Sequence, residues 1–181
     1  MDYAIASATR ALLAERGYAG MSVEAVANRA RVGKPAIYRR YKTKTDLVMA
    51  SVSRQLPRIE PPDLDDTRAE LWRAVEQGLP ADGRSYVSLV GGLMAEEERH
   101  PELIAAFRES LLLPRRETVK RIIERGKARG DLSMELDPEA AVDLMVGPFL
   151  ARVFAGLDTG PEWRRSAFNT WWALIRAAPD R

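Results

Sequence analysis

Residues 22–47, SVEAVANRARVGKPAIYRRYKTKTDL, decide how this chain folds. A serine opens the stretch, where its hydroxyl can accept an orphan backbone N–H, and apolar residues then recur at helical spacing. Arg31-Val32-Gly33 is typical of a tight turn. Pro35 suits the first turn of a second helix, because its missing N–H costs little there. Thr43 and Asp46 are spaced as a capping box that opens a third helix.

The second of these helices, expected over about residues 34–41, carries a basic face. Ile37 and Tyr41 are four residues apart and therefore face inward. The outward side then holds four cationic or aromatic residues, which are Lys34, Tyr38, Arg39 and Arg40. A helix of this length is a rod of about 12 Å, which fits a major groove about 12 Å wide. The stretch therefore predicts a helix-turn-helix that presents this face to double-stranded DNA.

Charge is distributed unevenly along the 181 residues, although the formal net charge is only +2. Residues 1–56 hold ten Lys or Arg and four Asp or Glu, whereas residues 57–181 hold eighteen and twenty-two. A charged run is usually just a solvated face, so a basic surface helix of a small bundle is the alternative. The concentration of positive charge around the predicted motif favours DNA binding over that alternative.

The composition argues against an enzyme. There is no cysteine, so the chain has no disulfide, no thiolate metal site and no cysteine nucleophile. His100 is the single histidine, and no Ser or Asp pattern marks it as a member of a catalytic triad. The acidic run at residues 96–98 radiates around a helix and does not converge on a metal. We therefore expect no catalytic residue, no metal site and no cofactor.

Helical spacing and turn residues predict an all-α protein of about nine helices with one clear boundary. Pro57 and Pro61-Pro62 end the third helix of the motif. We expect a DNA-binding domain over residues 1–56, with a connecting helix at its end, and a helical ligand-binding and dimerisation domain over residues 57–181. The sequence has no secretion signal and no apolar run of membrane length, so we expect a cytoplasmic protein without a membrane partner.

Other helix boundaries are indicated by local signals. A first helix, from about Tyr3, should stop at Gly17. Thr67 with Glu70 is spaced as a capping box for the first helix of the second domain. Pro114 should kink or break the helix that contains it.

The last two predicted helices are rich in tryptophan. Trp171 and Trp172 are adjacent and point about 100° apart on a helix, so one inward face cannot bury both. A second apolar face invites a partner, and two helices from each subunit would form a four-helix interface around a two-fold axis. The expected homodimer interface comprises Phe149, Val153, Trp163, Phe168, Trp171, Trp172 and Ile175. The alternative is a thick internal core.

The helices that precede Pro114 supply a candidate ligand pocket. Its expected lining is apolar and comprises Trp72, Tyr86, Val90, Met94, Phe107 and Leu111. For each of these residues the alternative is an ordinary place in the core. Apolar walls with few charges would suit a hydrophobic or aromatic effector.

The predicted helix-turn-helix resembles that of the tetracycline-repressor (TetR) family of bacterial one-component regulators. The matching residues are Gly17-Tyr18, Ser22-Val23, Val26-Ala27, Ala30, Val32-Gly33, Ile37-Tyr38, Tyr41 and Lys44 to Leu47. The resemblance implies that Tyr38 and Lys44 hold the phosphate backbone. It also implies that the bases are faced or flanked by Lys34, Pro35, Ala36, Arg39 and Arg40, and Ser22 and Val23 complete the expected DNA-binding set.

The resemblance covers nearly the whole chain. Residues 129–132, 136–141 and 147–152 are similar to one type of TetR-family C-terminal domain, in which the last two helices carry dimerisation. Arg31 stands where the family usually has glycine, and a left-handed backbone there would cost an arginine about 1 kcal/mol. The chain also starts almost at the first helix, so no basic N-terminal arm is expected.

We therefore expect a repressor that binds a palindromic operator as a homodimer and that a small hydrophobic ligand releases. Within the family, a regulator without ligand response and an activator are the alternatives. Outside it, a sequence-independent architectural protein is the alternative, and such a protein would show no preference for a palindrome.

Overall fold

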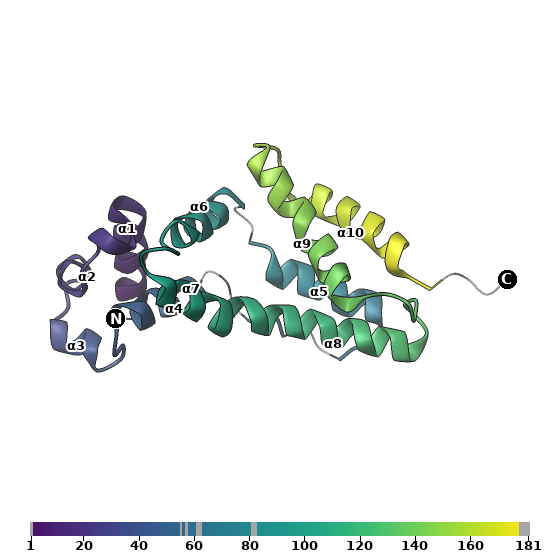
Figure 1. Cartoon of the computed structure of the whole chain (residues 1–181), viewed down its shortest axis with the longest axis horizontal. Coiled ribbons are helices and arrows are strands. Elements are labelled where there is room, and N and C mark those ends of the chain that lie inside the picture. The colour runs from purple at the N-terminus through teal and green to yellow at the C-terminus, as the bar shows by residue number, and fades with distance from the viewer. Residues whose placement is uncertain (1, 55, 57, 61–62, 81–82, 178–181) are drawn as a thin grey trace. The chain divides into compact units, whose positions relative to one another are not determined.

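The computed structural model describes residues 2–54, 56, 58–60, 63–80 and 83–177, and its regular structure is helical (Figure 1). The α-helices are α1 (Asp2–Gly20), α2 (Val23–Ala30), α3 (Lys34–Tyr38), α4 (Lys44–Ser53), α5 (Thr67–Gly78), α6 (Gly83–Met94), α7 (Pro101–Phe107), α8 (Leu113–Arg129), α9 (Pro138–Phe154) and α10 (Pro161–Ile175). A π-helical segment, η1 (Arg108–Leu112), joins α7 to α8. Among the described residues, β-pairing is limited to an isolated antiparallel bridge between Leu132 and Arg176. The predicted all-α fold is confirmed.

The chain forms two compact units. They comprise residues 1–57 with 88–113, and residues 58–87 with 114–181. Helix α6 therefore begins in the second unit and ends in the first. The predicted domain boundary after Leu56 lies beside the point at which the chain passes from the first unit into the second. No sequence signal indicated that residues 88–113 return to the first unit. The prolines expected at that boundary, Pro57, Pro61 and Pro62, lie outside the described residues.

Apolar faces of α1, α2, α4 and α7 meet in the core of the first unit. α1 packs against both α2 and α4, and α4 also packs against α7. The buried side chains of this core include Ile5, Leu12, Val26, Ile37, Leu47, Leu103 and Phe107. Their burial ties the helix-turn-helix to the long first helix and to α4.

Helix α1 continues beyond the predicted stop at Gly17 but is broken there. Gly17 has a φ of +67°, a left-handed backbone that glycine adopts without a steric cost. After the break Tyr18 is buried, and its hydroxyl lies 2.8 Å from Thr45 Oγ1. The glycine therefore allows the end of α1 to contact the start of α4.

At Pro114, where the sequence predicted a kink or break, the structure changes from a π-helix to an α-helix. Proline has no N–H to donate, so an interior position would interrupt the hydrogen-bond ladder of an α-helix. The chain widens to the π-helical segment η1, and α8 then starts with Pro114 as its second residue. At that position a helix needs no donor from its own ladder, so the proline is tolerated.

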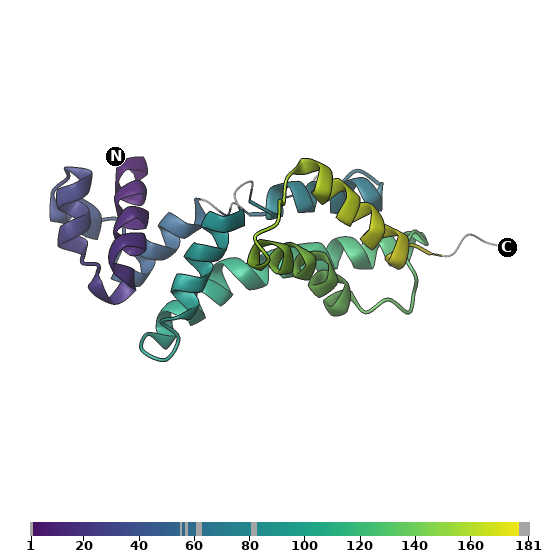
Figure 2. The ribbon, with the colours of Figure 1, turned by 90° about the horizontal axis from the view of Figure 1, so that it is seen from above.

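The second unit buries its apolar residues among α5, α8, α9 and α10, and α9 and α10 pack side by side (Figure 2). The Phe168 ring contacts the Trp72 ring edge to face, with centroids 5.1 Å apart. The Trp171 indole N–H donates to the Ala141 carbonyl at 3.1 Å. This buried hydrogen bond connects α10 to α9, so Trp171 is part of the core of its own chain.

Asp66, and not Thr67, caps α5. The Asp66 carboxylate accepts the Ala69 N–H at 2.9 Å. Thr67 is buried as the first helical residue, and its hydroxyl donates to Asp131 at 2.7 Å. The predicted capping box of Thr67 with Glu70 is therefore wrong, because an aspartate precedes the threonine and is at least as good a cap.

Glu70 is fully buried and belongs to an ion network. Its Oε1 lies 3.0 Å from Arg129 Nη1, and its Oε2 pairs with Arg125. Arg129 also contacts Asp63 and Asp65, at 3.0 and 3.1 Å. A buried carboxylate is tolerated when it is paired and hydrogen-bonded, so this network joins the first turns of α5 to the last turns of α8.

Gly126 allows α8 to approach α5 closely. A methyl group added at Gly126 would overlap the Thr67 methyl and would lie 2.9 Å from Leu132 Cδ1. We therefore expect Gly126→Ala to lower the free energy of unfolding by about 1–3 kcal/mol through overpacking, although alanine is the better helix former. Urea denaturation followed by circular dichroism measures this change.

Gly92→Ala in α6 is the matched control. A methyl group added there meets no described atom within 4 Å. The free energy of unfolding of that variant should rise by up to about 1 kcal/mol, because alanine has a higher helix propensity than glycine. Equal stability changes in the two variants would contradict the close packing at Gly126.

Candidate nucleic-acid interface and apolar pocket

The helices of the motif are capped as the sequence predicts. Ser22 Oγ accepts the Ala25 N–H at 3.1 Å. At the far end of α2, Arg31 adopts the left-handed backbone with φ +55°, so this arginine bears the strain that glycine would avoid. The capping box of α4 is complete, since the Asp46 N–H donates to Thr43 Oγ1 at 3.0 Å and the Thr43 N–H donates to Asp46 Oδ2 at 2.9 Å.

Helix α3 is shorter than predicted. It has five residues, and the chain then turns at Arg39 and Arg40 where the sequence predicted three more helical residues. Ile37 is 1% exposed and anchors the helix in the core of the first unit. Because Ile37 faces inward, Lys34 and Tyr38 lie at the surface, as expected.

The cations of this surface differ in their partners. Lys34 Nζ lies 3.8 Å from Glu24 Oε2, which is a weak exposed pair. Arg40 is held more closely, with its Nε 2.9 Å from Asp2 Oδ1. Arg39 is exposed and makes no ion pair with any described residue. Arg39 is therefore the guanidinium of this surface with the greatest freedom to reach a base edge.

Lys44 begins α4 beside the motif. Its Nζ lies 4.1 Å from the centroid of the Tyr18 ring, over the ring face. Partial burial lowers the pKa of Lys44, and the carboxylates of Glu96 and Glu102 oppose that shift. The ammonium group thus lies over an aromatic ring, and two carboxylates of the same unit act on it.

Two residues of the expected DNA-binding set have little surface. Val23 is 9% exposed and packs into the core, so its side chain does not face a groove. Ala36 is half-buried. Ser22 and Pro35 are exposed, as a DNA contact requires. The first position of α2 turns the Val23 side chain inward, and the DNA contact expected of this residue stays a prediction.

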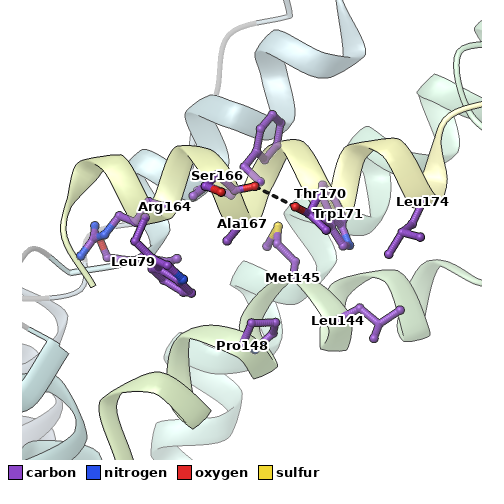
Figure 3. Close-up of a pocket in the computed structure, with 13 residues that line it drawn as sticks. Leu79, Leu144, Met145, Pro148, Arg164, Ser166, Ala167, Thr170, Trp171 and Leu174 are labelled. Carbon is purple, nitrogen blue, oxygen red and sulfur yellow. Dashed lines mark hydrogen bonds between the residues drawn. The ribbon is translucent and has the colours of Figure 1, made fainter. Parts of the chain in front are cut away.

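An apolar pocket of about 340 Å³ lies in the second unit among residues of α5, α9 and α10 (Figure 3). Its lining comprises Val75, Leu79, Leu144, Met145, Pro148, Trp163, Arg164, Ser166, Ala167, Phe168, Thr170, Trp171 and Leu174. Figure 3 shows Met145 pointing from α9 toward Ala167 and Thr170 of α10. The walls are mainly aliphatic and aromatic, so the pocket suits an apolar molecule.

The expected ligand-pocket residues belong to different units of the chain. None of them lines the pocket among α5, α9 and α10. Those of the first unit are Val90, Met94, Phe107 and Leu111, and those of the second are Trp72 and Tyr86. Phe107 and Leu111 are buried in the core. The prediction treated residues 67–113 as part of one body, whereas the chain returns to the first unit at Ser88.

Several residues expected at the dimer interface are buried within their own chain, and the interface itself stays a prediction. The residues that are buried within their own chain are Phe149, Phe168, Trp171 and Ile175. Those that are half-buried are Val153, Trp163 and Trp172. Core residues offer no surface to a partner, so the alternative of an internal core holds for the first group.

The large apolar side chains of α9 and α10 that are exposed are not among those expected at the interface. They are Leu144, Phe154 and Leu174, which are 55%, 75% and 74% exposed. The spacing of residues along α10 could have indicated that Leu174 is exposed. Trp171 and Ile175 are four residues apart and share an inward face of the helix that excludes Leu174.

Neither a metal centre nor a membrane span is found in the part of the chain that the structure describes. Within residues 2–177, apart from the undescribed gaps, no group of three or more His, Cys, Asp or Glu side chains could hold a metal ion. No helix among these residues has both the length and the apolar character needed to cross a bilayer.

Two family models match the chain. One is described as bacterial regulatory proteins of the tetR family and matches residues 5–50, which include the helix-turn-helix. The other is described as a tetracyclin repressor-like C-terminal domain and matches residues 61–167, more than half of the chain.

Individual proteins are similar as well. YdeS, an uncharacterized HTH-type transcriptional regulator of Bacillus subtilis strain 168, is 30% identical over 164 residues, which cover 88% of this chain and 79% of that protein. Among solved structures, the flavonoid-responsive regulator FrrA has a TM-score of 0.66 and 21% identity over 98% of each chain. The fatty acid degradation regulator FadR from Bacillus halodurans has a TM-score of 0.68 and 18% identity over 94% of each chain.

The solved structures share the fold, and the family models and the Bacillus subtilis relative share the sequence pattern. Proteins of this family are DNA-binding regulators and not enzymes. A capped helix-turn-helix with an exposed basic surface, in a chain matched along most of its length, leads to one conclusion: this chain belongs to the TetR family of DNA-binding helix-turn-helix transcriptional regulators.

Proposed function

We propose that this chain is a repressor that binds an inverted-repeat operator as a two-fold dimer and leaves it when a small hydrophobic molecule binds. The observation that carries the proposal is the exposed cationic surface around α3, held in place by buried Ile37. That surface lies within the segment matched by the tetR-family model, which supports insertion of α3 into a major groove. The site of action would be the cytoplasm.

Base reading is assigned to Arg39, and phosphate contacts are assigned to Tyr38 and Lys44. An exposed guanidinium can donate two hydrogen bonds to the edge of a guanine, which is the commonest specific contact. The Tyr38 side chain is 49% exposed, so its hydroxyl can reach a phosphate oxygen. Lys44 stands at the N-terminus of α4, where the ammonium group and the helix dipole both favour an anion.

The exposed apolar side chains of α9 and α10 support a dimer. Leu144, Phe154 and Leu174 would lose their contact with water if the same helices of a second copy packed against them. One α3 contacts few base pairs, so a single DNA-binding unit would bind weakly. Two units spaced by about 34–36 Å would read both halves of an inverted repeat.

The pocket among α5, α9 and α10 is the proposed effector site. Its volume of about 340 Å³ is at the lower end of the range for small-molecule sites, and Trp163, Phe168 and Trp171 provide flat apolar walls. FrrA, which shares this fold, is a flavonoid-responsive regulator, so the fold is compatible with response to an aromatic molecule. An effector acts only if it prefers the form of the protein that does not fit DNA.

A regulator that lacks ligand response is the alternative within the family, and an activator is another. Both would keep the DNA-binding surface and the dimer. They differ from the main proposal in their response to added ligand, because only the repressor would leave its operator.

Lys44→Ala and Arg39→Ala should weaken DNA binding in different ways. Loss of the Lys44 phosphate contact should lower affinity equally for preferred and random duplexes and flatten the salt slope by about one unit per protomer. Loss of Arg39 should cost about 1–3 kcal/mol on the preferred duplex and relax the preference at particular base pairs. Fluorescence anisotropy titrations at several salt concentrations measure both effects.

Arg121→Ala is the control, because Arg121 is an exposed arginine of α8 in the other unit. It should leave both the affinity and the salt slope unchanged. A salt slope that Lys44→Ala does not alter would contradict the phosphate role. An equal loss on both duplexes in Arg39→Ala would contradict base reading.

Leu174→Glu should shift the protein from dimer to monomer. The substitution places a charge on the proposed interface, and its desolvation on association would be costly. Because Leu174 is 74% exposed, the monomer should keep its helical circular dichroism. Analytical ultracentrifugation measures the mass. Met134→Glu is the control and should remain dimeric, since Met134 is 71% exposed in the segment before α9. A Leu174→Glu variant that stays fully dimeric would refute the proposed interface.

Ala167→Phe should fill the pocket and abolish the response to effector while leaving DNA binding intact. A thermal-shift screen of flavonoids and other planar aromatic compounds identifies a stabilising compound, and anisotropy then measures the release of DNA. Ala128→Phe, at an exposed position of α8 that does not line the pocket, should keep the response. Unchanged release in Ala167→Phe would place the effector site elsewhere.

A further inference from the structure

The corner between α6 and α7, residues 95–100, belongs to the same unit as the helix-turn-helix. Glu96 in this corner is 9% exposed, and its Oε2 has no hydrogen-bond partner among the described residues. A methyl group added at Gly17 would lie 3.4 Å from Glu96 Oε1, so this carboxylate lies against the break in α1. A buried carboxylate without a hydrogen bond is costly, and a nearby cation is the usual compensation.

Lys44, which lies over Tyr18 beside that break, is a cation on which this carboxylate acts. Its ammonium group lies over the face of the Tyr18 ring, and the His100 ring contacts the same tyrosine edge to face, with centroids 4.8 Å apart. Tyr18 therefore contacts both the first residue of α4 and the last residue of the α6–α7 corner. Glu102 Oε1 lies 3.3 Å from His100 Nδ1, so this carboxylate is joined to the same tyrosine through the histidine ring. The carboxylates of Glu96 and Glu102 raise the pKa of Lys44 against the larger, opposite effect of burial.

We propose that Glu96 and Glu102 are positioning residues that restrain the Lys44 ammonium group over Tyr18 and weaken its contact with a DNA phosphate. The α6–α7 corner and the first turn of α7 would then set the DNA affinity of the unit through Lys44. This inference rests on the proposed phosphate role of Lys44.

The physical basis is competition between anions for one cation. A carboxylate near Lys44 attracts the ammonium group toward the protein and reduces the positive potential that a phosphate would meet. Desolvation by the Tyr18 ring strengthens this competition, because charges interact more strongly where water is partly excluded. Neutralising either carboxylate should therefore increase DNA affinity, whereas loss of an ordinary structural contact would leave affinity unchanged or lower it.

The test compares Glu96→Gln and Glu102→Gln, each alone and in the Lys44→Ala background. Glutamine keeps the shape of glutamate and removes its charge. Glu102 has a side chain that is 59% exposed, so Glu102→Gln stays informative even if the buried substitution disturbs folding. Glu98→Gln is the matched control, because it removes the same charge from an exposed position of the same corner.

Each glutamine variant should increase the affinity for the preferred duplex by about two- to fivefold per DNA-binding unit. The salt slope should stay the same, because the number of phosphates contacted does not change. In the Lys44→Ala background the increase should disappear, which gives a coupling between the two sites in a double-mutant cycle. Glu98→Gln should change affinity by less than either variant.

Three results would overturn the inference. They are unchanged or reduced affinity in both glutamine variants, an increase that persists without Lys44, and an equal increase in Glu98→Gln. The proposed phosphate role is tested separately by Lys44→Ala alone. If that variant weakens binding while the glutamine variants do nothing, the phosphate role stands and the restraint by the corner is refuted. If Lys44→Ala leaves binding unchanged, both are refuted.

Discussion

Burial of Ile37 is the constraint on which the DNA-binding surface depends. Helix α3 has five residues, far fewer than a helix needs to be stable alone in water, so tertiary packing must hold it. Because Ile37 is the buried residue of α3, its inward direction also fixes which side chains face outward. One apolar contact therefore both stabilises the helix and orients Lys34, Tyr38 and the arginines that come after them.

The motif was predictable because its signals are local. Ser22, Thr43 and Asp46 cap helices through atoms three residues away, and such contacts are encoded in short stretches of sequence. The left-handed backbone of Arg31 was expected from the resemblance to the TetR family, which usually has glycine at that position. The length of α3 was not, because the hydrophobic spacing of Ile37 and Tyr41 is the same whether the chain continues as a helix or turns at Arg39.

The place of the apolar pocket was not predictable, because it depends on which elements meet. Val90 and Phe107 belong to the first unit, since the chain crosses back at Ser88, and no turn signal in the sequence marks that crossing inside α6. Trp171 is apolar and large wherever it lies, and only the hydrogen bond to Ala141 shows that it is internal. Apolar character predicts burial but does not say whether the partner is the same chain.

The central claim is that two copies of the basic surface around α3 read one DNA site together. Selection of bound duplexes from a random-sequence pool by the purified full-length chain tests this claim most directly. Joint reading by two units should enrich an inverted repeat whose half-sites are separated by about one helical turn or a multiple of it. Enrichment of no sequence, or of a single half-site without a symmetric partner, would contradict the account.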